Sequence, residues 1–107
     1  MGYWISLDFN DEIVKVDRHS EGGTYALGGT DEASISVTYN YAKFFQFRDL
    51  HGVRAGDTIE TLQTKVAELG TKIHHDYWEP TPGNVGYTLS VLLEWAMQHP
   101  DAVWDVR

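Results

Sequence analysis

Residues 77–84 are the part of the sequence best suited to bind a small ligand. They read YWEPTPGN, so two aromatic side chains precede two prolines that stiffen the chain. The segment leads into an expected helix start, where the backbone N–H groups of Gly83 and Asn84 could attract an anion. A base stacked on a neighbouring aromatic ring would make this a site for a phosphorylated nucleotide. The residues assigned to this hypothesis are Tyr77, Trp78, Thr81, Gly83 and Asn84.

A second candidate lies at the strand-to-helix junction of residues 38–42. Here Asn40 could hydrogen-bond a ligand or satisfy the backbone where the strand ends, and the second role is favoured. If this junction lies beside residues 77–84, Tyr39 and Asn40 would line one pocket with them. The simpler interpretation of residues 77–84 is a rigid, well-capped helix start whose aromatic rings fill the core, because every helix has an N-terminus.

Motifs for catalysis and metal binding are missing from the sequence. No serine lies in a G-x-S-x-G elbow, and neither GxxxxGK[ST] nor GxGxxG is present. The run His74-His75-Asp76 resembles a metal cluster, but adjacent residues on a strand point to opposite faces. We therefore expect no enzymatic activity, no cofactor and no metal ion. A small hydrolase whose acids or histidines are gathered only by folding is kept as a second alternative.

The chain is strongly acidic, with 16 acidic and 8 basic residues and a formal net charge of −8. This balance argues against direct nucleic-acid binding, because phosphate contacts need clustered Lys and Arg. It serves solubility, and it also fits a protein partner with a basic groove. There is no cysteine, hence no disulfide framework or thiolate metal site. Without a long apolar run or a secretory signal, we expect a cytoplasmic protein that does not contact membranes.

The first half of the chain is typical of strands. A length of 107 residues predicts a single domain over residues 1–107. Alternating apolar and polar side chains, clearest around Ile5 and Ile35, indicate half-buried strands. The expected strands cover residues 3–9, 13–17, 24–27 and 33–41. Turns are expected at Asn10-Asp11 and at the two Gly-Gly-Thr segments, residues 22–24 and 28–30.

The second half is typical of helices, expected at residues 41–50, 57–69 and 81–98, with a short terminal strand at residues 102–106. Asp57 and Glu60 form an acidic variant of the capping box, and Gly70 is placed to end that helix. Thr81 is the expected N-cap of the last helix. Together these elements predict an α+β fold, in which a four-stranded antiparallel meander is followed by two or three helices packed on one face.

The last helix carries more apolar surface than a surface helix needs. Beside its core stripe, Tyr87, Val91 and Trp95 form a second stripe at positions i, i+4 and i+8. Either this helix is the buried centre of the domain, or its second stripe meets another chain. The latter predicts a homo-oligomer. Trp4 and Trp104, near the two ends of the sequence, would supply further apolar anchors for an interface.

Three segments resemble a group of small microbial proteins, some of them encoded by phages or prophages. They are VTYNY at residues 37–41, YWEPTPGN at residues 77–84 and HPDAVW at residues 99–104. The resemblance spans most of the chain and implies a stand-alone domain that acts as an accessory or counter-defence factor on a mobile element. It carries no catalytic residue over.

The sequence thus favours a non-catalytic acidic interaction protein, an inhibitor or adaptor that acts through a protein partner. The charge, the missing catalytic motifs and the second helix stripe support this hypothesis. The alternative is a small-ligand binder or sponge for a phosphorylated nucleotide at the Thr81–Asn84 helix start.

Overall fold

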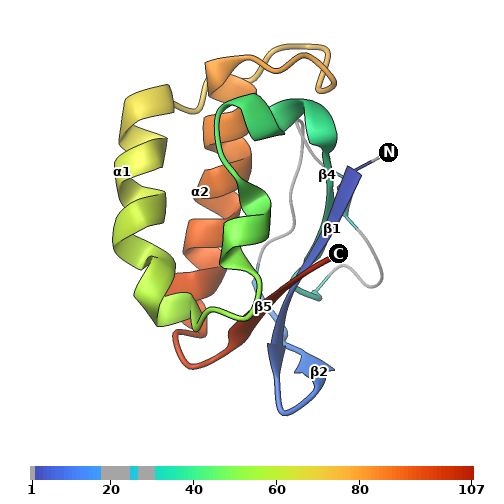
Figure 1. Cartoon of the computed structure of the whole chain (residues 1–107), viewed down its shortest axis with the longest axis vertical. Helices are drawn as coiled ribbons and strands as arrows, with labels where there is room; N and C mark the ends of the chain where they lie inside the picture. The colour runs from blue at the N-terminus through green and yellow to red at the C-terminus, as the bar shows by residue number, and fades with distance from the viewer. Residues whose placement is uncertain (1, 18–24, 27–30) are drawn as a thin grey trace.

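The computed structural model describes residues 2–17, 25–26 and 31–107. The strands are β1 (Gly2–Phe9), β2 (Glu12–Ile13), β3 (Tyr25–Ala26), β4 (Ser34–Thr38) and β5 (Val103–Val106). The helices are α1 (Ile59–Leu69) and α2 (Pro82–Gln98), with 3₁₀ turns η1 (Tyr39–Lys43), η2 (Phe47–Leu50) and η3 (Ala55–Thr58). The expected α+β class is confirmed, because an antiparallel sheet is followed by two α-helices on one of its faces (Figure 1). The expected turns at residues 22–24 and 28–30 lie outside the described residues.

The strand order is not sequential, because β1 lies in the middle of the sheet. Ile5 of β1 pairs with Ile35 of β4 and also with Val106 of β5, so these two strands occupy opposite edges of β1. The path of the sheet is β2-β1-β4-β3, with β5 added to β1. The physical reason is that the inward side chains of β1 are fully covered, and a covered strand needs hydrogen-bond partners on both edges. The expected terminal strand supplies the second edge.

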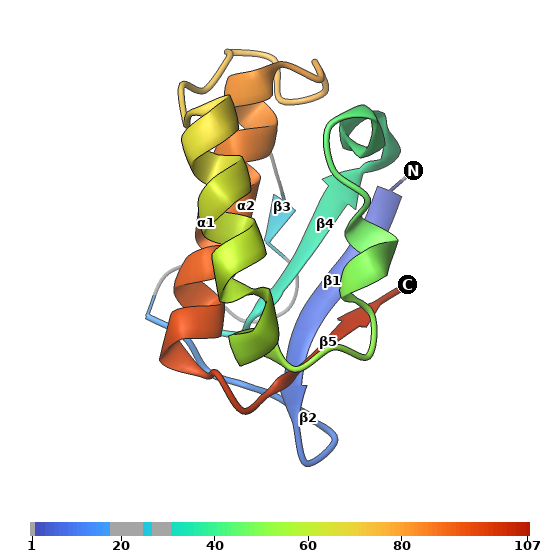
Figure 2. The ribbon, with the colours of Figure 1, turned by 60° about the vertical axis from the view of Figure 1, so that its left-hand side comes forward.

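A tight hairpin joins β1 to β2 at one end of the molecule. Asn10 and Asp11 both have positive φ, 53° and 65°, as the two-residue turn of a twisted hairpin requires. Beyond β2, the chain continues alongside the residues that precede β4, with the Val16 N–H donating to the Asp31 carbonyl oxygen at 2.7 Å. The α2–β5 turn lies at the same end of the molecule (Figure 2).

The outer edge of β5 is covered by residues 51–55. The Trp104 N–H donates to the Val53 carbonyl oxygen at 3.1 Å, and the Gly52 N–H donates to the Trp104 carbonyl oxygen at 2.9 Å. At the end of the strand the Val106 N–H donates to Nδ1 of His51 at 3.0 Å. These bonds satisfy peptide groups that an edge strand otherwise presents to other chains.

Helix α2 is the buried centre of the domain. Leu89 and Leu92 are fully buried, as the core stripe predicts, and so are Val91 and Trp95 of the second stripe. Gly86 allows a close approach to the end of α1, because a β-carbon there would collide with the carbonyl oxygen of Gly70. No helix of the described ranges is both long and apolar enough to cross a bilayer.

Several predicted helix ends form as expected and others do not. Gly70 ends α1 with a φ of 74°, and the Thr81 hydroxyl accepts from the Asn84 N–H at 3.1 Å at the start of α2. The acidic capping box is not observed: Asp57 pairs with Arg54 at 3.2 Å, and α1 has no side-chain cap bond at Thr58. The expected helix over residues 41–50 forms two 3₁₀ turns, since packing its aromatic side chains outweighs regular helix formation.

Candidate functional site

The two segments proposed to bind a ligand do lie together, but they are bonded to each other. Asn40 Nδ2 donates to the Trp78 carbonyl oxygen at 3.1 Å, and the Tyr41 hydroxyl donates to the Tyr77 carbonyl oxygen at 2.5 Å. Burial, and next the Asp76 carboxylate, raise the pKa of Tyr41, so its phenol stays protonated as a donor. Asn40 therefore satisfies the backbone, the role that the sequence favoured.

Asn84 holds the preceding loop in place and is completely buried. Its Oδ1 accepts from the His74 N–H at 2.8 Å. Its Nδ2 donates to the carbonyl oxygens of Asp76 and Glu79, at 3.1 and 2.9 Å. Both amide hydrogens and the amide oxygen are thus engaged within the protein. The side chain assigned to a ligand is thus bonded to the protein's own loop.

The N-terminus of α2 is covered as well as capped. The backbone N–H of Asn84, expected to be free for an anion, donates to the Thr81 hydroxyl. At Gly83 the chain is packed so closely against Lys72 that a β-carbon would collide with the Lys72 carbonyl oxygen. The helix start predicted to bind an anion is therefore capped by Thr81 and packed against the loop that precedes α2.

Aromatic surface does persist at this end of the molecule. Tyr39 and Trp78 are each 42% exposed. The Tyr77 ring lies beside the Trp78 ring, with centroids 4.9 Å apart. Among the residues assigned to the nucleotide hypothesis, Tyr39 and Trp78 therefore have aromatic surface that a partner could contact.

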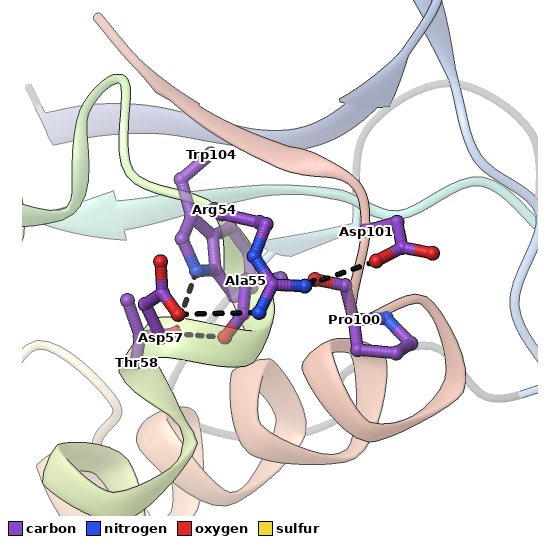
Figure 3. A network of polar contacts seen from close by, with 7 residues as sticks. All are labelled: Arg54, Ala55, Asp57, Thr58, Pro100, Asp101 and Trp104. Carbon is purple, nitrogen blue, oxygen red and sulfur yellow. Dashed lines mark hydrogen bonds and ion pairs between the residues drawn. The ribbon is translucent and has the colours of Figure 1, made fainter.

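The predicted interface is largely internal. Val91, Trp95 and Trp104 are buried within the chain, which leaves almost none of their surface accessible to a partner. The Trp104 indole N–H donates to the Thr58 hydroxyl at 3.0 Å, which in turn donates to the Ala55 carbonyl oxygen at 2.7 Å (Figure 3). An apolar stripe in a helix sequence predicts burial, but it does not distinguish burial by the same chain from burial by another chain. Tyr87 is half-buried.

Trp4 is the predicted interface residue that remains exposed, at 54%. It lies on the outer face of the sheet, where its indole N–H donates to the Ser34 hydroxyl at 3.0 Å. A small cavity of about 210 Å³ beside it is lined by Asp8, Asp105 and Arg107 among others. Arg107 Nε lies 3.0 Å from the Asp105 carboxylate, so an ion pair lies at this cavity.

The adjacent histidines stack on each other instead of converging with other ligands. The ring centroids of His74 and His75 are 4.2 Å apart, and His74 Nδ1 accepts from the Asp76 N–H at 3.1 Å. Over the ranges that the structure describes, no three His, Asp or Glu side chains are grouped as metal ligands.

A groove that the sequence did not indicate opens at the opposite end of the molecule. It has a volume of about 580 Å³ and exceeds a second cavity of about 430 Å³ between η2 and α1. Its lining residues are Phe9, Glu12, Ile13, Val14, Lys15, Gln98, His99, Pro100, Asp101 and Ala102. One wall is the β1–β2 hairpin and the other is the α2–β5 turn. These segments are far apart in the sequence, and no motif links them.

The two walls of the groove are tied together. His99 Nε2 donates to the Lys15 carbonyl oxygen at 2.6 Å, and the Asp17 N–H donates to Gln98 Oε1 at 3.3 Å. The α2–β5 turn is braced from outside by Arg54. Its Nη1 donates to the Pro100 carbonyl oxygen at 3.1 Å and to Asp101 Oδ1 at 2.9 Å (Figure 3). The groove is therefore formed by fixed elements.

The surface around the groove is acidic. Besides Glu12 and Asp101 in the lining, the neighbouring chain carries Asp11, Asp17, Asp31 and Glu32. Lys15 is paired with two of these carboxylates, at 3.5 Å from Asp31 and 3.6 Å from Glu32. The last turn of α2 contains no basic residue to offset the negative end of the helix dipole.

Comparison of the chain with protein-family models, with curated proteins and with solved structures finds no match.

Proposed function

We propose that this protein is a non-catalytic interaction domain that binds a partner protein in the groove between the β1–β2 hairpin and the α2–β5 turn. The observation that carries the proposal is Phe9, a large apolar side chain left 50% exposed at a groove whose two walls are hydrogen-bonded to each other. Fixed concave surfaces with an accessible aromatic ring are suited to receive an anchor residue of another protein.

A protein partner fits the groove better than a small molecule does. Sites for small ligands bury most of the ligand and direct a few polar groups towards it. This groove is open, and its polar residue His99 uses Nε2 to hold the opposite wall. The residues of the nucleotide alternative lie at the other end of α2, where Asn84 and Thr81 serve the fold.

The contacts of the groove also favour binding over hydrolysis. Its titratable residues include Glu12, His99 and Asp101. Asp101 is paired with Arg54 at 2.9 Å, and His99 bridges to Lys15. Asp101 and His99 are thus engaged in contacts within the protein, which favours a role in shaping the groove over one in hydrolysis.

Within this proposal the protein acts in the cytoplasm as an inhibitor or adaptor. The resemblance to phage and prophage proteins favours an inhibitor of a host protein. The burial of Val91 and Trp95 removes the main argument for a homo-oligomer, so a single chain is taken as the binding unit.

The test is site-specific photo-cross-linking in the source cell or its phage host. Benzoylphenylalanine replaces Phe9 in one variant and Trp78 in the other, since both are exposed aromatic residues at opposite ends of the molecule. We expect one partner protein in near-stoichiometric adduct from position 9 and none from position 78. Adducts from position 78 alone, or from neither position, would overturn the proposal.

A further inference from the structure

We propose that the groove binds a cationic segment of the partner, in which Lys or Arg side chains face the carboxylates and one apolar side chain packs on Phe9. The inference rests on the proposed function and names the chemistry of the partner at the same site. It follows from three properties of the groove, which are its carboxylates, its helix end and its apolar lining.

The carboxylates lie on both walls and are accessible. Glu12 of the hairpin is exposed, and the Asp101 side chain on the opposite wall is 81% exposed. A cationic chain lying in the groove would therefore meet negative charge on each side. Charge complementarity of this kind directs encounter and fixes the orientation of the bound segment.

The end of α2 adds to the same negative field. This helix has 17 residues and reaches the groove through Gln98 and His99, with no basic residue in its last turn. The aligned peptide dipoles leave partial negative charge at a helix C-terminus, where cations are favoured. The helix contribution is independent of the side-chain carboxylates.

Among the described residues, the two cations at the groove are each paired with carboxylates. Lys15 lies between Asp31 and Glu32. Arg54, which braces the α2–β5 turn, lies between Asp57 and Asp101. Lys15 and Arg54 therefore leave no excess of positive charge that would attract an acidic partner. The described surface of the groove favours a positively charged one.

The lining also demands an apolar group. Phe9, Ile13, Val14, Pro100 and Ala102 supply the apolar part of the walls. A site of carboxylates alone would hold any polycation through long-range attraction, which salt screens. A site with an exposed phenyl ring prefers a segment that combines basic residues with an aromatic or aliphatic side chain, and part of that affinity survives high salt.

Two other occupants fit less well. A second copy of this chain docked through the same end would bring two acidic surfaces together, which is unfavourable. Nucleic acid carries the same sign of charge as the groove and is repelled by it. A basic segment of a different protein is the occupant to which the charges and the lining are complementary.

The test is fluorescence anisotropy with three labelled 12-residue peptides. One alternates Lys and Arg with Leu and Trp, the second replaces its basic residues with Glu, and the third replaces its apolar residues with Ser. We expect the first to bind wild-type protein at least tenfold more tightly than either of the others at 150 mM salt. Equal binding of the acidic peptide, or no binding of the first, would overturn the inference.

Matched variants locate the binding. Glu12→Lys in the groove and Glu60→Lys on α1 change the net charge equally, and both positions are exposed. We expect Glu12→Lys to weaken binding at least tenfold and Glu60→Lys less than twofold. Phe9→Ser should weaken binding of the first peptide, whereas Trp78→Ser should not. Equal effects within either pair would place binding elsewhere and refute the inference. Circular dichroism checks each fold, with Glu12→Gln as a milder second variant.

The two proposals can fail separately. If position 9 cross-links a partner protein but no cationic peptide binds, the interaction function stands and the inference about partner chemistry falls. If the cationic peptide binds through Glu12 but position 9 captures no protein in cells, the chemistry of the groove stands and the interaction function falls.

Discussion

Asn84 Oδ1 accepts a hydrogen bond from the His74 backbone N–H at 2.8 Å, and this contact fixes the loop that closes over the start of α2. The same side chain donates to two carbonyl oxygens of that loop. A residue that the sequence placed in a ligand site thus organises the backbone around it, and the difference can be measured.

Asn84→Ala should lower the free energy of unfolding by about 2–4 kcal/mol, because it leaves one buried N–H and two carbonyl oxygens without their partner. Asn40→Ala is the control, since Asn40 is exposed and makes one bond to the loop; we expect a loss of less than about 1 kcal/mol. Urea unfolding measures both. Equal stability of the Asn84 variant and wild type would mean that the loop is held by other contacts.

Gly86→Ala should destabilise the protein by about 1–3 kcal/mol, because the added methyl group meets the Gly70 carbonyl oxygen and must force α1 and α2 apart. Ser90→Ala, one turn further along α2, is the matched control, with an expected change within about 0.5 kcal/mol. Thermal unfolding followed by circular dichroism provides the comparison. A more stable Gly86→Ala variant would contradict the close approach of the two helices.

The Tyr41 hydroxyl should make stability depend on alkaline pH. In the unfolded chain a phenol ionises near its ordinary pKa of 10.0, whereas in the folded protein burial and Asp76 raise the pKa of Tyr41. The stabilisation that the protonated Tyr41 hydroxyl contributes is therefore complete below pH 10 and is lost as the pH rises further. Tyr41→Phe should be less stable than wild type by about 1 kcal/mol at pH 8, through the lost bond to Tyr77.

Phenylalanine at this position cannot ionise. The difference in the free energy of unfolding between wild type and Tyr41→Phe should therefore become smaller as the pH rises above 10. Urea unfolding at a series of pH values measures it, and the other titrating groups cancel in the comparison. A difference in unfolding free energy that stays constant or widens above pH 10 would show that Tyr41 ionises at least as easily in the folded protein as in the unfolded chain.

The β1–β2 turn should respond in opposite directions to two substitutions of Asp11. Asp11 has a φ of 65°. Asp11→Gly should stabilise the protein by a few tenths of a kcal/mol, because Asn-Gly is the preferred pair for this turn. Asp11→Ala removes the same charge but should destabilise by about 1 kcal/mol, since alanine tolerates positive φ poorly. Chemical denaturation would distinguish them. Equal stability of the two variants would argue against the left-handed turn.

Features set by near neighbours in the chain were predictable from the sequence. The alternation around Ile5, the cap at Thr81 and the stop at Gly70 all depend on residues within about one helical turn or along one strand. The exception is the Asp57 cap. Asp57 bonds to Arg54 instead of capping the helix, and Arg54 also bonds to the distant Asp101. A local sequence pattern does not reveal that Arg54 competes for the Asp57 carboxylate.

Features that depend on distant parts of the chain were not predictable in the same way. The second apolar stripe of α2 indicated that Val91 and Trp95 are buried. Only the fold shows that the same chain buries them. The groove likewise arises where residues 9–15 meet residues 98–102. Phe9 lies directly before a turn, yet nothing in its local sequence indicates that it lines a groove.

The central position of β1 has a consequence for the speed of folding. Its pairing of Ile5 with Val106 joins residues about 100 positions apart, and such non-local contacts slow folding because the loop must close before the contact forms. Until β5 docks, one edge of the central strand has no partner and can pair with another unfolded chain. Refolding yield should therefore fall with protein concentration more steeply than the small size of the domain suggests.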